Sequence, residues 1–322
     1  MIRISSQPPH DFFLTLDVDE YFEAEDDPIE IAERGLVRGL NLSDRSVLAV
    51  IRYNQNPVEP VFEVELPEQD SPTKAEEAEI ERLVGRIVGS KIDLTAFEAA
   101  VADDPVLGPI VEEHYGFKRL ARSCFFEDAM RHIVRTRISH DPTRRRMVQD
   151  IRKAWGTGFE WQGRQYYSYP RPEVLAAVDP EDFRAFGISA RKGEYVVGLA
   201  ASIASGEIDQ DALEKMSAEE FWEVVNGIRG IGPATAQALM FRRNRADSNF
   251  MAQRSTSSKN RGQEVGYRRW LFSIYGIDPH DPDAVTEEAY EKIRANWRGF
   301  EAPVWHYLFY HWLMESKAAE HG

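Results

Sequence analysis

The fold class of this chain follows from nine residues, Ile228-Arg229-Gly230-Ile231-Gly232-Pro233-Ala234-Thr235-Ala236. Two glycines on either side of one apolar residue permit a tight hairpin, and proline is tolerated in the first turn of a helix. The N–H groups of such a turn point outward together and are suited to bind a phosphate. The nine residues therefore predict a helix–hairpin–helix that holds a DNA backbone, and a monovalent cation can share the turn. The alternative is a helix–helix connection whose glycines only permit close packing.

Helical patterns lie on both sides of this turn. Ser217 followed by Glu220 is a capping box that opens a helix over 218–226, and a second helix is predicted over 234–243. Apolar residues at helical spacing predict further helices at 126–133, 172–177, 180–186, 192–204, 265–275, 287–297 and 303–317. One long irregular stretch, 247–263, is rich in Ser, Asn, Gln and Arg. We therefore expect an all-helical core over 111–322, made of two helical lobes with the hairpin at 228–236.

The first third of the chain has a different pattern. Residues 12–16, 47–53 and 62–66 are β-branched or alternate in strand fashion, and 54–57 is typical of a turn. A helix is predicted after them, because Ile80, Leu83, Val84 and Ile87 fall on one helical face. The predicted fold class is thus mainly α. A smaller α+β domain with an antiparallel sheet, over 1–110, precedes the helical core.

The net negative charge of the chain comes from this first third. The net charge is −15 over 322 residues, and residues 1–110 alone hold 9 Lys and Arg against 24 Asp and Glu. The remaining residues are neutral overall, and 118–153 carries eleven basic residues that are suited to contact phosphate. The alternative for this basic stretch is a solvated helix surface. A nucleic-acid partner is therefore compatible with the charge of the helical core.

Composition excludes several classes of protein. The single cysteine, Cys124, excludes an internal disulfide, a four-cysteine zinc site and a four-cysteine iron–sulfur cluster. No apolar run reaches the roughly 18 residues that a membrane span needs. Residues 1–13 lack the basic and apolar regions of a secretory signal. We expect a cytoplasmic monomer that does not associate with a membrane.

Several blocks, in the right order along the chain, resemble the helix–hairpin–helix DNA glycosylase superfamily, and in particular bacterial 3-methyladenine DNA glycosylase II and the 8-oxoguanine branch. Beside the hairpin, these blocks are Asp103-Asp104-Pro105-Val106-Leu107, Phe125-Phe126-Glu127, 169–178, 186–195 and Trp297-Arg298-Gly299-Phe300. The acidic α+β start is similar in kind to the sheet domain that precedes the core in those enzymes. The resemblance implies a protein that binds double-stranded DNA containing a modified base, flips the base and hydrolyses its N-glycosidic bond.

The resemblance also implies a catalytic acid, with one departure from the family. The family's aspartate opens a helix of the form acid, apolar, Gly, apolar, Arg, Arg, and Glu264-Val265-Gly266-Tyr267-Arg268-Arg269 reproduces that form with glutamate. This alignment requires extra residues within 251–263. A carboxylate near a helix start can stabilise a cationic sugar and position a water, so Glu264 is the expected catalytic residue. Asp247 is the fallback acid, and the alternative for Glu264 is a helix-dipole partner.

Ala234 bears on the reaction type and on the base pocket. Family members that also cleave the strand carry a Schiff-base lysine at this position, so the resemblance implies an enzyme without lyase activity. Alkyl-base enzymes often carry aromatics there and one turn later, where this chain has alanines, so the pocket wall loses bulk. We expect the pocket to be formed by Ala234, Ala238, Phe300, Ser255, Thr256 and Asn260. The alternatives are alanines that pack against a neighbouring helix and a loop that is only a surface insertion.

DNA contacts are expected from the hairpin and from a second segment. In the hairpin they involve Arg229, Gly230, Gly232, Ala234 and Thr235. The family's paired glutamines, which fill the gap near the opened base pair, are replaced by Thr136 and Arg137. An arginine there can bond to the orphaned base or occupy the vacated stack, or it can be an exposed helix arginine that contacts phosphate.

These observations predict a monofunctional DNA glycosylase, active in base excision repair or against bulky modified bases of invading DNA such as that of phages. No organic cofactor and no metal site are expected, apart from the monovalent cation at the hairpin. The alternative from another class is a catalytically inactive descendant that binds or bends DNA, since the ancestral aspartate is replaced.

Overall fold

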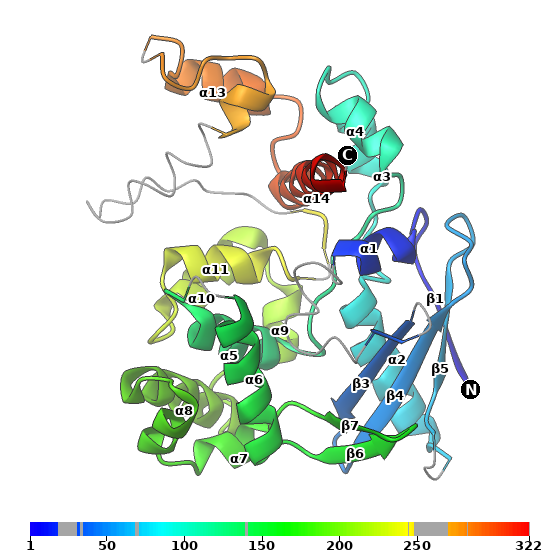
Figure 1. Cartoon of the computed structure of the whole chain (residues 1–322), viewed down its shortest axis with the longest axis vertical. Coiled ribbons are helices and arrows are strands. Elements are labelled where there is room, and N and C mark those ends of the chain that lie inside the picture. The colour runs from blue at the N-terminus through cyan, green and yellow to red at the C-terminus, as the bar shows by residue number, and fades with distance from the viewer. Residues whose placement is uncertain are drawn as a thin grey trace. The chain divides into compact units, whose positions relative to one another are not determined.

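The computed structural model describes residues 1–18, 31–32, 35–67, 71–138, 141–243, 245–247, 270–281 and 283–321. The chain forms two compact units (Figure 1). Unit 1 comprises Met1–Asp93 and Gly116–Arg245, and unit 2 comprises Leu94–Tyr115 and Ala246–Gly322. This division differs from the expected boundary at residue 110, because each unit is assembled from two separate segments of the chain.

Unit 1 begins with an antiparallel sheet in the strand order β1-β5-β4-β3-β2. Its elements are β1 (Ile2–Ser5), α1 (Phe12–Val18), β2 (Ile31–Ala32), β3 (Gly35–Asn41), β4 (Ser46–Tyr53), β5 (Val61–Glu65) and α2 (Lys74–Val88). The expected strand over 12–16 is wrong, since these residues are helical. The buried side chains of α1 are Phe12, Thr15 and Leu16, and their spacing of three and four residues is that of one face of a helix.

Both faces of the sheet are buried. Alternate side chains of a strand point to opposite faces, so the apolar residues of β3 and β4 divide into two sets. One set, which includes Leu36, Ala49 and Ile51, packs in a core with residues of α2 such as Ile80 and Leu83. The other set, Val37, Leu48 and Val50, packs with Tyr166. The sheet is therefore enclosed between α2 and a second element.

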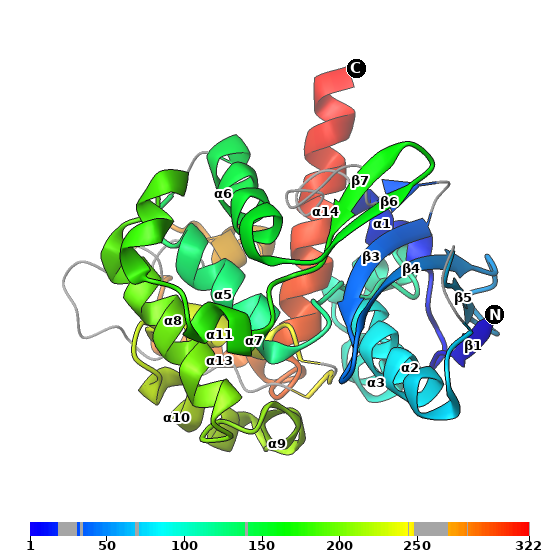
Figure 2. The same ribbon diagram turned by 90° about the horizontal axis from the view of Figure 1, so that it is seen from below.

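That second element is a hairpin of two short strands, β6 (Gly158–Trp161) and β7 (Arg164–Tyr167), which runs beside β3 (Figure 2). Its presence corrects the expectation of an all-helical chain after residue 111. Tyr166 of this hairpin is 1% exposed. The strands were missed because each has only four residues. Their apolar side chains, Phe159, Trp161 and Tyr166, pack against the sheet, and this contact is not visible in the sequence.

The helices of unit 1 follow, and they include those predicted in this region; the helices Asp141–Trp155 and Gln210–Lys215 were not predicted. The helices are α5 (Phe125–Arg135), α6 (Asp141–Trp155), α7 (Pro172–Ala176), the 3-10 helix η3 (Pro180–Phe186), α8 (Ala190–Ala204), α9 (Gln210–Lys215), α10 (Ala218–Gly227) and α11 (Pro233–Met240). The capping box is present at the start of α10. Glu220 N–H donates to the Ser217 hydroxyl at 3.2 Å, and Ser217 N–H donates to the Glu220 carboxylate at 2.9 Å.

The described residues of unit 2 are mainly helical. It contains α3 (Thr95–Val101), α4 (Leu107–Glu113), a helical segment at 270–274, α13 (Glu287–Arg294) and α14 (Glu301–His321). The ring of Phe97 lies 5.5 Å from the ring of Tyr307, and the Tyr275 hydroxyl donates to a carboxylate oxygen of Asp104 at 3.0 Å. These contacts explain why residues 94–115 group with the C-terminal segment.

The structure confirms the predicted fold class, which is mainly α with an antiparallel sheet near the start. Among the described helices, none is long and apolar enough to cross a membrane.

Candidate nucleic-acid interface

The connection between α10 and α11 is a tight hairpin, as the sequence predicts. Ile231 N–H donates to the Ile228 carbonyl at 3.0 Å and closes the turn. Gly230 has a φ of +96°, and a Cβ at this position would lie 2.6 Å from the Cβ of Tyr195 on α8. Both the backbone conformation and the packing therefore require glycine here. The alternative role of the hairpin glycines, which is to permit close packing, therefore applies to Gly230.

The first turn of α11 is open to solvent. Gly232, Pro233 and Ala234 are exposed, and a Cβ at Gly232 would have nothing within 4 Å. Gly232 is the N-cap of α11 and supplies no side-chain hydrogen bond to the helix. Because the first N–H groups of a helix have no acceptors within it, the backbone at Gly232, Ala234 and Thr235 offers donors to an anion. A large anionic group can approach this turn.

The hairpin can also offer oxygen ligands to a cation. Residues 229–232 carry no side-chain oxygen, so a monovalent cation at the turn would be held by backbone carbonyls. Neutral carbonyl oxygens are the ligands that such ions take in selective sites. The Gly232 carbonyl already accepts from Ala236 N–H at 2.9 Å, so the cation at the hairpin stays a prediction.

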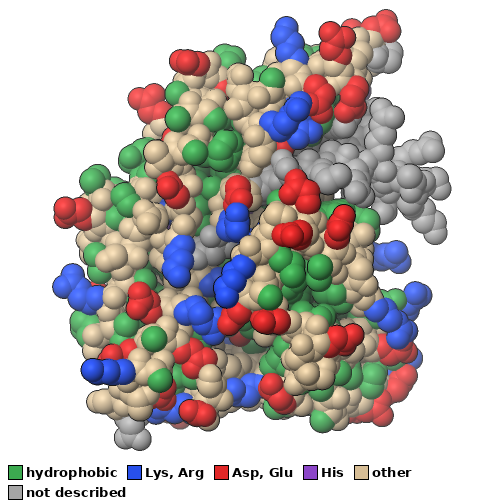
Figure 3. Space-filling model, turned by 180° about the vertical axis from the view of Figure 1, so that it is seen from behind, with side chains coloured by type: hydrophobic (Ala, Val, Ile, Leu, Met, Phe, Trp, Pro, Cys, Tyr) green, Lys and Arg blue, Asp and Glu red, His purple; other side chains and the backbone are tan. Residues whose placement is uncertain are grey.

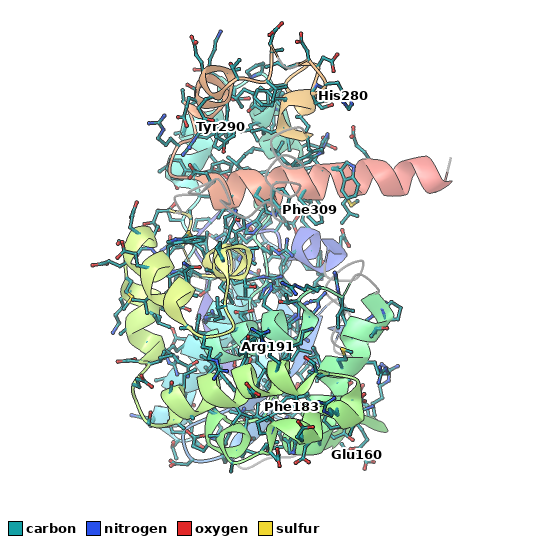
Figure 4. The ribbon with its side chains drawn as sticks, turned by 90° about the vertical axis from the view of Figure 1, so that its left-hand side faces the viewer. Glu160, Phe183, Arg191, His280, Tyr290 and Phe309 are labelled. Carbon is teal, nitrogen blue, oxygen red and sulfur yellow. The ribbon has the colours of Figure 1, made fainter. Side chains whose placement is uncertain are left out.

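Helix α8 places charged and aromatic side chains beside the hairpin. Arg229 Nη2 lies 3.1 Å from a carboxylate oxygen of Glu194, and the guanidinium of Arg229 lies 5.6 Å from the centroid of the Tyr195 ring. Arg191, labelled on α8 in Figure 4, donates from Nε to the Tyr195 hydroxyl at 2.6 Å. Arg191, Glu194 and Arg229 are exposed. Two cations thus flank the hairpin, and one of them is partly neutralised by a carboxylate.

The same helix holds the segment with Thr136 and Arg137. Lys192 Nζ donates to the carbonyls of Val134 and Thr136, at 2.6 and 2.7 Å. Burial lowers the pKa of Lys192, and the charge of Arg137 lowers it further. Thr136 is the C-cap of α5, and Arg137 after it is exposed with a φ of +62°. Arg137 therefore lies on a turn beyond the helix end, not on the helix, and its backbone is in a conformation that side chains other than glycine rarely adopt.

The first turns of α8 are the part of the site that sequence reasoning missed. Arg191 and Lys192 stand in the first turn of α8, which contains no acidic residue. Cations are unfavourable at a helix N-terminus, where the helix dipole is positive. This local conflict was the signal available in the sequence. Contacts with both the hairpin and the turn at Arg137 come from this single helix.

The basic stretch at 118–153 is only partly a surface. Four of its cations are buried: Lys118, Arg122, Arg131 and Arg152. Lys118 Nζ donates to the carbonyls of Gln7 and Ile92, and Arg152 donates to the carbonyl of Tyr167. On the face seen in Figure 3, Lys and Arg side chains are interspersed with Asp and Glu. The expectation of phosphate contacts is wrong for the four buried cations, and Arg137, Arg146 and Lys153 remain exposed.

The other predicted site residues divide into three groups. Glu264, Ser255, Thr256 and Asn260 lie outside the described residues. Ala234 is exposed and Ala238, one turn later on α11, is half-buried. In unit 2, Asp247 is exposed, and the half-buried ring of Phe300 lies 6.1 Å from the ring of Phe97. The structure thus brings together the hairpin residues, Thr136 and Arg137 through α8.

Comparison with known proteins gives a consistent result. No protein-family model matches the chain. The chain is 30% identical over 150 residues to "DNA-3-methyladenine glycosylase" of Bacillus subtilis (strain 168), which is 47% of this chain and 49% of that relative. The chain therefore spans about half the length of this curated relative.

Solved structures share the fold over nearly the whole chain. A 3-methyladenine DNA glycosylase from Archaeoglobus fulgidus superposes with a TM-score of 0.70 at 20% identity, over 96% of this chain and 97% of that one. An 8-oxoguanine glycosylase/lyase of Clostridium acetobutylicum, in complex with double-stranded DNA containing cytosine opposite 8-oxoG, gives a TM-score of 0.59 at 16% identity, over 92% and 93%. The resemblance to the helix–hairpin–helix glycosylases is confirmed.

Proposed function

We propose that this protein is a monofunctional DNA glycosylase, which binds double-stranded DNA, flips a modified base and hydrolyses its N-glycosidic bond to leave an abasic site. The observation that carries the proposal is the exposed first turn of α11, with backbone donors at Gly232, Ala234 and Thr235 beside Arg229. Such a turn binds phosphate through its N–H groups and its dipole. The name of the curated relative supports glycosylase activity.

In this proposal, the two ends of the interface have different roles. The hairpin holds the DNA backbone, and a phosphate replaces Glu194 as the partner of Arg229. Arg137 occupies the gap that the flipped nucleotide leaves, where its guanidinium can bond to the orphaned base. Lys192 fixes the two carbonyls that precede Arg137, so the side chain is presented from a backbone that is already ordered.

The proposed chemistry depends on a carboxylate. When the C–N bond breaks, its electron pair leaves with the base, and the sugar becomes cationic. A carboxylate stabilises that charge and accepts a proton from the water that attacks the sugar. We assign this role to Glu264 from its sequence context, with Asp247 as the fallback.

The absence of lyase activity is proposed from Ala234, which has no amine to form a Schiff base. Incubated with its substrate, the protein should yield alkali-labile abasic sites and leave the strand intact. Borohydride should trap no covalent adduct. A trapped adduct together with strand cleavage would contradict the monofunctional proposal.

A panel of duplexes that carry alkylated, oxidised or bulky modified bases tests the activity and separates a repair enzyme from one directed at modified invading DNA.

Glu264→Gln should lower excision by about a hundredfold or more, with DNA binding intact. Glu288→Gln, at an exposed position in the first turn of α13, is the control and should be neutral. If Asp247→Asn abolishes excision instead, the fallback acid is correct. If no duplex yields abasic sites but DNA is bound, the inactive DNA-binding alternative is correct.

The polar stretch at 255–261 is proposed to select the base. Ser255, Thr256 and Asn260 supply donors and acceptors, and the alanines at 234 and 238 leave room for a bulky or polar substituent. Shortening this stretch should change which base is accepted in the same panel. Unchanged base preference would mean that it is only a surface insertion.

A further inference from the structure

Three potential metal ligands meet in unit 2, between the end of α4 and the middle of α14. They are Glu113, His114 and His311, and their ligand atoms all lie within 4.8 Å of one another. His114 Nε2 lies 3.2 Å from His311 Nδ1. The Glu113 carboxylate lies 3.5 Å from His311 Nδ1 and 4.0 Å from His114 Nε2.

We propose that these three side chains bind a zinc ion. Tetrahedral Zn²⁺ with bonds of about 2.0–2.2 Å to nitrogen and oxygen separates its ligand atoms by about 3.4 Å. The distances of 3.2, 3.5 and 4.0 Å are close to this separation. Two imidazoles and one carboxylate form a ligand set that zinc uses in proteins. Only small side-chain adjustments are needed to centre an ion among them.

The surroundings of the two histidines are those of a metal site. The second ring nitrogen of His311, Nε2, lies 3.5 Å from a carboxylate oxygen of Glu315, one turn further along α14. Such a carboxylate holds a ligating histidine in the tautomer and orientation that metal binding needs. His114 is 5% exposed, and its ring stands edge-on to the ring of Tyr310, with 4.6 Å between the ring centroids. This contact restricts the rotation of the His114 ring. The two histidines are thus held in position before an ion binds, and the exposed Glu113 completes the ligand set.

The site also has access for an ion and for a fourth ligand. Glu113, His311 and Glu315 line a cavity of about 400 Å³, whose apolar walls include Leu308 and Trp312. Phe309, labelled on α14 in Figure 4, lies two residues before His311 and marks this part of the helix. Water from the cavity can complete the tetrahedron. The proposed ion would join α4 to α14 and so link the two segments of chain that form unit 2.

Metal titration of the untagged full-length protein tests the proposal. After treatment with a chelator, the protein should bind one equivalent of Zn²⁺, and Co²⁺ should give the visible absorption of a tetrahedral site. Zinc should also raise the melting temperature, because an ion that binds only the folded state stabilises it. His311→Ala should lose both effects. His280→Ala removes an exposed histidine elsewhere in unit 2 and should change neither.

Two milder variants keep the test valid if His311→Ala does not fold. Glu113→Gln, at an exposed position, should abolish stoichiometric binding. Glu315→Gln should weaken zinc binding by about tenfold to a hundredfold, which is typical for the partner of a ligating histidine. If the wild-type protein binds no zinc, or if Glu113→Gln and Glu315→Gln bind it unchanged, the two histidines form a hydrogen bond only and the proposal is wrong.

Discussion

Arginine side chains have two different roles in this chain. Arg242 donates to the carbonyl of Leu120 at 2.8 Å, and Arg243 donates to the carbonyls of Met216 and Glu214; both arginines are buried. These side chains satisfy backbone groups at places where segments distant in sequence meet. Arg229 and Arg191 are exposed at the hairpin and available to an anion. Charge alone therefore does not locate the interface, and burial has to be known for each residue.

The ion pair between Arg229 and Glu194 predicts an effect on DNA affinity. Glu194→Gln should tighten binding by up to about fivefold, because an exposed pair worth at most about 1 kcal/mol no longer competes with phosphate. Arg229→Ala should weaken binding and lower the salt dependence by about one counterion. Fluorescence anisotropy over a range of salt concentrations measures both. Glu65→Gln removes the same charge from the exposed Arg52 pair on the sheet and should have less effect.

His10 predicts a dependence of stability on pH. Its side chain is fully buried, and burial lowers its pKa well below 6.5, with a smaller contribution from the charge of Lys118. The folded state therefore keeps His10 neutral at pH values where the unfolded chain binds a proton. Stability should fall by about 1–2 kcal/mol between pH 7 and pH 5 from this group. Urea unfolding of wild type and His10→Gln at both pH values measures the difference; equal pH dependence would contradict it.

At the scale of elements, the hairpin shows that two similar glycines can have different functions. Gly230 is required by its positive φ and by the ring of Tyr195 behind it. Gly232 has an ordinary φ of −96° and open space beside it. The first glycine maintains the shape of the turn, and the second leaves room for a ligand.

This difference predicts opposite phenotypes for two alanine variants. Gly230→Ala should lower the free energy of unfolding by about 1–3 kcal/mol, since alanine is strained at this φ and displaces Tyr195. Gly232→Ala should cost at most about 1 kcal/mol, the usual difference at an N-cap, but should weaken DNA binding because its methyl group blocks the approach of the backbone. Denaturant unfolding and DNA titration separate the two effects. If Gly232→Ala binds DNA like wild type, the DNA backbone does not approach this turn.

At the scale of the whole molecule, buried charges join the sheet to the helices within unit 1. Arg86 on α2 lies 2.8 Å from a carboxylate oxygen of Asp128 on α5 and 2.9 Å from one of Glu214 on α9. Arg86 and Asp128 are 8% and 1% exposed. The β6–β7 hairpin adds a second connection, because it packs on the sheet. The acidic start of the chain is therefore an integral part of unit 1.

Removing this connection should be costly. Arg86→Ala leaves the Asp128 carboxylate buried without its partner and should lower the free energy of unfolding by about 3–5 kcal/mol. Arg52→Ala removes an exposed ion pair with Glu65 and should change it by at most about 1 kcal/mol. Urea unfolding of both variants measures these values. Similar, small losses for the two variants would show that Arg86 does not hold the sheet to the helices.

Features that depend on neighbours in the chain were predictable from sequence. The hairpin at 228–236, the capping box at Ser217 and Glu220, and the longer amphipathic helices are specified by residues within a few positions of one another. The expected strand at 12–16 failed for a local reason. Five residues are too few to separate the period of a strand from that of a helix. The candidate DNA contacts at the hairpin followed from local pattern in the same way.

Other features were decided by contacts between residues far apart in the chain. Which cations are buried, the approach of α8 to both the hairpin and Arg137, and the meeting of His114 with His311 across 197 positions depend on how helices pack. Packing also decides that residues 158–167 form strands, because Tyr166 is buried by its contact with the sheet. Local pattern specifies an element and its apolar face. It does not specify which distant surface covers that face, since the free energy of burial depends on area removed from water and not on sequence position.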